Sequence, residues 1–150
     1  MINSKDVLKS CKFPIISIST DKSTIRFNNH NDLITCGSLA LKRKYYENLK
    51  IIDSEGSVFV VQKAEKKKNN GFFWGYDIFL TKNIIVNLYA VKTETIINIE
   101  YLKEIVKKLI NKEKYFYESS GYSYDEYKDY INKSSTIEEV MLVFTDKLPL

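Results

Sequence analysis

The spacing of apolar residues changes along the chain, from β-rich and alternating segments in the first two thirds to helical spacing after residue 94. Alternation of apolar and polar positions is typical of strands with one buried face, whereas a period of 3.6 is typical of helices. The β-rich segments predict a mostly antiparallel sheet of about five strands, and they cover residues 13–19, 24–28, 49–53, 57–64, 72–80 and 84–91.

The central segments predict a meander, because short polar stretches separate them. Residues 54–56, Ser-Glu-Gly, fit a hairpin turn, and the polar stretch 66–71 is expected to connect two strands. In the strand 57–64, Val58 and Val60 face one way, and Phe59 and Val61 face the other. If helices cover only one side of the sheet, an exposed apolar patch is expected on the other side, formed by Phe59, Val61, Phe73, Phe79 and Tyr89.

Helices are expected at the C-terminal end. Asn98 can cap a helix with an apolar stripe and with its lysines, Lys103 among them, outside that stripe. Capping boxes at Ser123 with Glu126, at Ser135 with Glu138 and at Thr136 with Glu139 predict two further helices, near 123–133 and 136–145. A less regular helical piece, doubtful at Gly37, is expected between residues 28 and 41. The pattern predicts a single α+β domain over residues 1–150, with the C-terminal helices packed on one face of the sheet.

Composition is consistent with one globular domain, since 44% of the 150 residues are hydrophobic. No apolar run approaches the roughly 20 residues that a membrane-spanning helix needs, so no membrane association is expected. The N-terminus lacks the apolar centre of a secretory signal. Two distant cysteines, Cys11 and Cys36, fit reduced thiols, and we expect a cytoplasmic protein.

Catalytic chemistry has no recognisable motif in this sequence. The one histidine, His30, lies in a polar turn, and no group of cysteines, histidines and carboxylates has the spacing of a metal site. Phosphate-binding glycine motifs and a nucleophile elbow are also missing from the sequence. We therefore expect a protein that is not an enzyme and that has no cofactor and no metal.

The stretch from Tyr115 to Tyr130 contains six of the eleven tyrosines and opens the one acidic region of a basic chain. Residues 118–146 carry a net charge of −5, although the whole chain carries +4. Helical phasing places Tyr124, Tyr127 and Ile131 toward the core. The outward side forms a candidate partner-binding site of three carboxylates and two flanking tyrosines, namely Tyr122, Asp125, Glu126, Asp129 and Tyr130. The same pattern also fits a solvated helix face over a tyrosine-rich core.

Two other kinds of binding remain open. The segment 63–76 combines bases with aromatics, as single-strand nucleic-acid surfaces do, and its candidate contacts are Lys63, Lys66, Lys67, Lys68 and Trp74. However, the chain has 21 lysines and only two arginines, and phosphate-binding proteins usually include arginine, so the charge fits a solvated surface better than a nucleic-acid site. A homo-oligomer that pairs through an exposed sheet face is the third alternative.

Residues 45–80 resemble small bacterial immunity proteins that are encoded beside polymorphic toxins. The phrases that carry this resemblance are DSEG at 53–56 and FFWGY at 72–76. The resemblance implies a cytoplasmic protein that binds a cognate toxin domain and inhibits it by occlusion, without a catalytic site. It assigns no functional residue, because both phrases also fit a hairpin turn and a sheet strand. The positive net charge departs from the acidic balance of many immunity proteins against nucleases, which leaves the class of toxin open.

Overall fold

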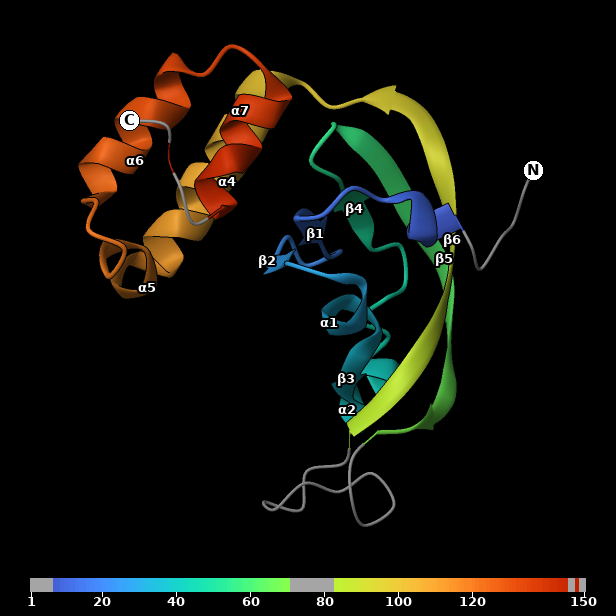
Figure 1. The fold of residues 1–150 in the computed structure, drawn as a ribbon. Helices are drawn as coiled ribbons and strands as arrows, with labels where there is room; N and C mark the ends of the chain where they lie inside the picture. Colours follow the sequence, from blue (N-terminus) through green and yellow to red (C-terminus); the bar gives the residue numbers. More distant parts are fainter. Residues whose placement is uncertain (1–6, 71–82, 146–147, 149–150) are drawn as a thin grey trace.

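A curled six-stranded antiparallel sheet forms the centre of the protein (Figure 1). The computed structural model describes residues 7–70, 83–145 and 148. The strands occur in the spatial order β2-β1-β4-β5-β6-β3, so β4, β5 and β6 form a meander. Their bounds are Ile15–Ile18 for β1, Thr24–Phe27 for β2, Thr35–Gly37 for β3, Lys50–Ile52 for β4, Ser57–Asn69 for β5 and Asn83–Ile96 for β6.

Short helices accompany the first half of the sheet, and the larger helices follow it. Near the sheet lie the 3₁₀ helix η1 (Val7–Ser10) and the helices α1 (His30–Ile34) and α2 (Ser38–Lys42). The C-terminal helices are α4 (Ile99–Lys112), α5 (Lys114–Glu118), α6 (Tyr124–Lys133), α7 (Ile137–Met141) and the 3₁₀ helix η2 (Leu142–Phe144). These C-terminal helices pack against the sheet, which confirms the predicted α+β class (Figure 1). Within the described residues, none of the helices has the length and apolarity needed to cross a membrane.

The central strands bury apolar side chains on both faces. On one face, Ile16, Ile52 and Val58 pack against α4, α6 and α7 in a core that we call the helix-side core. On the other face, the neighbouring residues of the same strands contribute to a second core beneath η1, α1 and α2, which we call the curl-side core. Its members include Leu8, Ile15, Leu33, Ile51, Phe59, Val61, Ile84, Val86, Leu88 and Ala90.

The prediction of an exposed apolar sheet face is therefore wrong for Phe59 and Val61. Phe59 and Val61 are fully buried in the curl-side core, and Tyr89 is half-buried. The sheet curls over the N-terminal segment and α1, so elements other than the C-terminal helices cover this second face (Figure 1). The predicted partners Phe73 and Phe79, and the predicted strand 72–80, lie outside the described residues. Phe59 and Val61 are thus not available for the homo-oligomer contact that the alternation suggested.

Strand boundaries differ from the prediction at three places. One of them is β6, which was predicted to end at residue 91 and continues to Ile96. The lysine-rich stretch at 66–69, expected as a connection, continues β5, where Lys66 pairs with Val86 and Asn69 pairs with Ile84. Backbone pairing satisfies the amides here while the lysine side chains stay in solvent, so polarity alone does not end a strand. The helical piece near Gly37 is split by β3, whose Cys36 pairs with Ile84 of β6.

The helix starts follow the predicted caps. The Asn98 side chain accepts from the backbone N–H groups of Glu100 and Tyr101 at 2.9 and 3.2 Å, and the boxes at Ser123 and Thr136 are both formed. Ser135 differs, because its backbone N–H donates to Glu139 at 2.6 Å rather than to Glu138. The short helix α5, which lies inside the tyrosine-rich stretch, was not predicted.

Lys103 was expected outside the apolar stripe of α4 and is instead buried, at 7% exposure. Its ammonium donates to the Glu100 carboxylate at 3.0 Å and to the Asn132 carbonyl at 3.4 Å. A lysine can bury its methylene stem while the charged end keeps polar partners, and this explains the departure from the pattern.

The turn between β4 and β5 is organised by the buried carboxylate of Asp53. It accepts from the backbone N–H of Ser57 at 2.8 Å and of Glu55 at 3.1 Å, and from that of Lys12 at 3.3 Å. Gly56 has a φ of +85°, which confirms the predicted turn glycine. A Cβ at Gly56 would lie 2.6 Å from Cδ1 of Ile137, so the turn also touches α7.

We expect Gly56→Ala to lower the free energy of unfolding more than Gly121→Ala. Both glycines have positive φ, which costs other residues roughly 1–2 kcal/mol, but a Cβ at Gly121 would meet nothing within 4 Å. The difference between the losses of unfolding free energy in the two variants therefore measures the effect of the contact with Ile137. Chemical denaturation measures it, and adding Ile137→Val, which removes Cδ1, should recover part of the loss. Equal losses for the two alanine variants would contradict this account of the turn.

Candidate functional site

The predicted acidic face lies on α6 and is exposed, as helical phasing indicated. Asp125, Glu126 and Asp129 are all exposed, whereas Tyr127 and Ile131 of the same helix are buried. Asp129 pairs with Lys133 at 3.6 Å, a contact between two exposed side chains that contributes little stability. Asp125 makes no hydrogen bond or ion pair with the described residues. The structure therefore brings the three carboxylates together on one helix, with lysine side chains at its edge.

Glu126 has a structural role as well as an exposed position. Its carboxylate accepts from the Ser123 backbone N–H at 2.7 Å and from the Ser123 hydroxyl at 3.0 Å. These hydrogen bonds, first the one from the backbone and then the one from the hydroxyl, lower the pKa of the Glu126 carboxyl. The carboxylate is therefore ionised at neutral pH and fixed at the start of α6.

The two flanking tyrosines are less available than predicted, because both are half-buried and pack against the helix-side core. The Tyr122 ring meets the Tyr127 ring edge-on, with centroids 6.0 Å apart. Burial, followed by the nearby Glu139 charge, raises the pKa of the Tyr130 hydroxyl. These rings border the acidic face rather than project from it.

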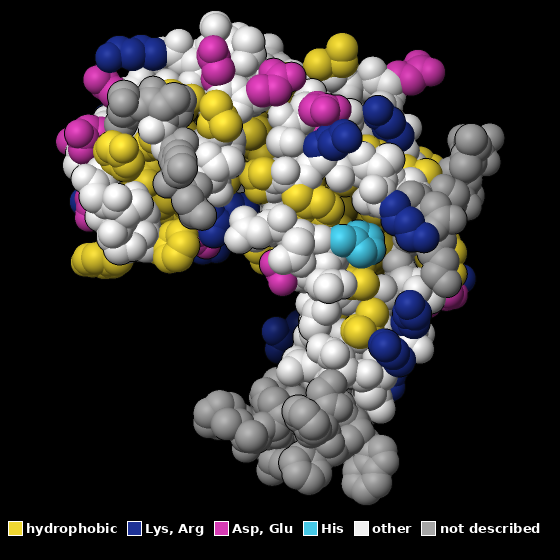
Figure 2. Space-filling model, viewed as in Figure 1, with side chains coloured by type: hydrophobic (Ala, Val, Ile, Leu, Met, Phe, Trp, Pro, Cys, Tyr) yellow, Lys and Arg dark blue, Asp and Glu magenta, His cyan; other side chains and the backbone are white. Residues whose placement is uncertain are grey.

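Among the described residues, the most exposed aromatic rings lie on α5, which precedes the acidic helix. Tyr115 is 91% exposed and Phe116 is 60% exposed. In the view of Figure 2, acidic side chains lie along the outer edge of the helical half, and basic side chains predominate over the lower part of the sheet. The helical half therefore presents exposed rings and carboxylates, although Tyr115 and Phe116 were not among the predicted contacts.

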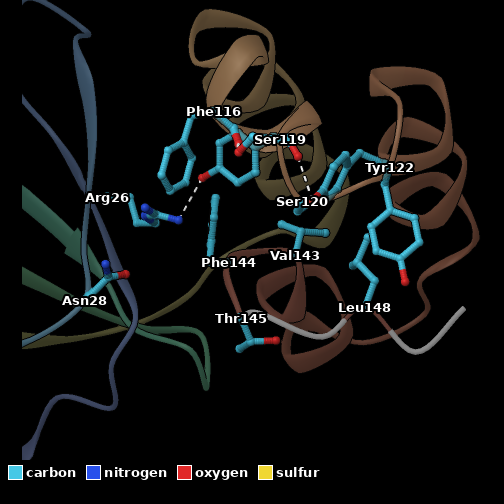
Figure 3. A pocket seen from close by; sticks show the side chains of 12 residues that line it. Arg26, Asn28, Phe116, Ser119, Ser120, Tyr122, Val143, Phe144, Thr145 and Leu148 are labelled. Carbon is cyan, nitrogen blue, oxygen red and sulfur yellow. Dashed lines mark hydrogen bonds between the residues drawn. The ribbon is translucent and has the colours of Figure 1, made fainter.

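A pocket of about 550 Å³ lies between β2 and the C-terminal helices, beside these rings (Figure 3). Arg26 of β2 projects into it and packs among the rings of Phe116, Tyr117 and Phe144, with 5.4–5.6 Å between its guanidinium carbon and each ring centroid. Its Nη1 donates to the Tyr117 hydroxyl at 3.0 Å. The wall opposite is formed by Val143 and Leu148, with Ser119, Ser120 and Tyr122 above it (Figure 3).

Sequence reasoning missed this pocket because its parts come from distant positions. Arg26 and Tyr117 are 91 residues apart, and strand alternation alone places Arg26 only on the face opposite Phe27. A weak signal was present, since Arg26 is one of only two arginines in a lysine-rich chain. Burial raises the pKa of the Tyr117 hydroxyl, with Arg26 opposing that change, so the phenol is neutral at physiological pH.

The four lysines of the nucleic-acid alternative, Lys63, Lys66, Lys67 and Lys68, lie along β5 and are exposed. Lys63 forms an ion pair with Glu65, and its ammonium lies 5.8 Å from the centroid of the Tyr89 ring. Lys67 lines a separate pocket of about 380 Å³ with His30 and Asn87. Trp74 lies outside the described residues.

Residues 7–70 and 83–145 contain no cluster of three or more histidines, cysteines and carboxylates that could hold a metal ion. His30 is half-buried, and burial, followed by the charge of Lys9, lowers its pKa. Burial also raises the pKa of the Cys11 thiol to about 12, which favours an inert protonated group.

Comparisons with known proteins add no relative, because no family model, no curated protein and no solved structure matches the chain. The candidate surfaces are therefore argued from their own geometry.

The link between Ser123 and Glu126 predicts a measurable titration. We expect Ser123→Ala to raise the pKa of the Glu126 carboxyl part of the way toward its ordinary value of 4.5, because the backbone hydrogen bond remains. A lowered folded-state pKa means that the contribution of Glu126 to stability is present above pH 4.5 and is lost as the pH falls through the folded-state pKa. NMR titration of the side-chain carboxyl group measures the pKa of Glu126 in the original protein and in the Ser123→Ala variant.

The matched control is Ser135→Ala, which removes the equivalent hydroxyl contact to Glu139 in front of α7. It should leave the Glu126 titration unchanged and raise the pKa of Glu139 instead. An unchanged Glu126 titration in Ser123→Ala would refute the proposed origin of the shift.

Proposed function

We propose that this protein binds one partner protein through its C-terminal helical half and inhibits that partner by occlusion. The observation that carries the proposal is the exposed acidic face of α6, formed by Asp125, Glu126 and Asp129, in a chain whose net charge is otherwise positive. A complementary basic surface on the partner would be attracted to this face during diffusional encounter.

The exposed rings of α5 supply the second part of the argument. Electrostatic attraction sets the rate of encounter, whereas buried aromatic contacts contribute most of the affinity of protein interfaces. Tyr115 and Phe116 are large, stiff and exposed, and they belong to the helix that precedes the acidic one. We therefore extend the predicted contact set, Tyr122, Asp125, Glu126, Asp129 and Tyr130, to include Tyr115 and Phe116.

The specific form of the proposal is an immunity protein that binds a cognate bacterial toxin domain in the cytoplasm. Its support is the resemblance of residues 45–80, together with the exposed carboxylates of α6 and the exposed rings of α5. Occlusion requires no chemistry from the inhibitor, and carboxylates on a rigid helix suit a basic cleft. The nucleic-acid alternative has less support, because Lys63 is paired with Glu65 and Lys67 lines a different pocket from the one beside α5.

The test needs a candidate toxin from a neighbouring gene. It uses the C-terminal domain of a large secreted protein encoded directly beside this chain. We expect the two proteins to form a 1:1 complex and co-expression to restore growth. The double variant Asp125→Lys/Asp129→Lys should lower the association rate constant at low salt by at least about tenfold, since charge complementarity changes on-rates over that range. Glu126 is left in place because it caps α6.

The control is Glu47→Lys/Glu55→Lys, which changes the net charge equally at two exposed positions of the sheet half. It should leave association nearly unchanged if the acidic face of α6 is the docking surface. Equal effects of the two double variants would show that only net charge matters and would rule out this site. Retention of nucleic acid in a low-salt gel-shift assay, abolished by Lys66→Glu/Lys68→Glu, would favour the alternative instead.

A further inference from the structure

We propose that the pocket between β2 and the C-terminal helices is a binding site for a carboxylate with an apolar body, and that Arg26 and Tyr117 bind the carboxylate group. The cavity of about 550 Å³ is within the size range, roughly 300–1,000 Å³, of small-molecule sites. Its lining combines one charged side chain with aromatic and aliphatic walls (Figure 3). This inference does not depend on the proposed function, because the ligand can be tested without any partner protein.

Arg26 has unused hydrogen-bonding capacity. A guanidinium carries five N–H donors, and the one hydrogen bond that the Arg26 side chain makes with the described residues goes to the Tyr117 hydroxyl. None of the described carboxylates pairs with it, although it is half-buried among three rings. With respect to the described residues, Arg26 is therefore a partly desolvated cation without a counter-charge, and arginine binds carboxylates through two parallel hydrogen bonds.

Tyr117 can supply a second donor to the same group. Its hydroxyl oxygen accepts from Arg26, and its own proton goes to no acceptor among the described residues. Burial keeps the phenol protonated by raising its pKa. An oxygen of the ligand that lies beside both groups would thus receive an N–H from Arg26 and the O–H of Tyr117.

Two other polar groups of the pocket, the hydroxyls of Ser119 and Ser120, are already occupied by hydrogen bonds. The Ser120 hydroxyl donates to the Tyr117 carbonyl at 2.6 Å and lies 2.6 Å from the Tyr127 hydroxyl. The Ser119 hydroxyl donates to the Phe116 carbonyl at 2.5 Å. The side chain of Asn28, which directly follows β2 and also lines the pocket, makes no hydrogen bond with the described residues (Figure 3).

Arg26 is the one cationic side chain among the described lining residues, and this selects the class of anion. A monocarboxylate matches one guanidinium, whereas a phosphate dianion would leave an excess negative charge among apolar walls at high cost. The aliphatic and aromatic wall formed by Val143, Phe144 and Leu148 would contact the apolar part of the ligand. A free aryl or branched-chain acid and the C-terminal residue of a peptide share this chemistry.

The test titrates the full-length protein with phenylacetate and follows backbone amide resonances by NMR. We expect saturable shifts at Phe116, Tyr117 and Phe144, and affinities at least about tenfold lower for phenylacetamide and for inorganic phosphate, since each lacks one feature of the ligand. N-acetylphenylalaninate distinguishes the two sources of the carboxylate. A site for the C-terminal residue of a peptide should bind it more tightly than phenylacetate, whereas a site for a free acid should not.

Three variants locate the site. Tyr117→Phe removes only the hydroxyl and should weaken phenylacetate binding, whereas Tyr127→Phe, its matched control, should not. Asn28→Asp places a competing carboxylate beside Arg26 at an exposed position and should abolish binding while the protein stays folded. Arg26→Lys should weaken binding more than Arg43→Lys, which changes the exposed second arginine. Equal binding of phenylacetamide and phenylacetate, or full binding by Asn28→Asp, would overturn the proposal.

Discussion

The central strands carry apolar side chains on both faces, and the remaining elements are arranged to cover them. Ile16 and Ile52 belong to the helix-side core, whereas their neighbours Ile15 and Ile51 belong to the curl-side core. A sheet of this kind is unstable in water unless both faces are covered. The N-terminal segment with α1 and α2 covers one face, and the C-terminal helices cover the other.

Arg26 links the edge of the sheet to the helical half. It lies on β2, opposite Ile16, so the strand directs it toward the helix-side core. There its charge meets the negative faces of three rings, an attraction estimated at roughly 0.5–2 kcal/mol for each favourable pair, and its length spans the gap that α5 and η2 leave beside β2. The same geometry that holds the two layers together produces a cationic pocket next to the exposed rings of α5.

Much of the fold could be predicted because its signals are local. The caps at Asn98, Ser123 and Thr136 and the alternation around Ile84 each depend on residues a few positions apart. The errors concern features that depend on tertiary context: burial of Lys103 requires the carbonyl of Asn132, and burial of Phe59 requires η1 and α1. Helical phasing alone predicted that the carboxylates of α6 are exposed. The Arg26 pocket, in contrast, depends on a contact between residues 91 positions apart, which no local pattern encodes.

The apolar pairs in β1 and β4 have a consequence for strand register. In most half-buried sheets a shift of one residue would expose the buried set, so the apolar pattern itself specifies the pairing. Ile15-Ile16 and Ile51-Ile52 present the same side chain to either face, so a shifted β4 would still offer isoleucine to both cores. Polar groups at the strand ends must therefore distinguish the native register from the shifted one. Asp53 meets that need, because it receives the N–H of Ser57 from β5 and the N–H of Lys12 from the segment leading to β1, and thereby fixes the alignment of three strands from one buried carboxylate.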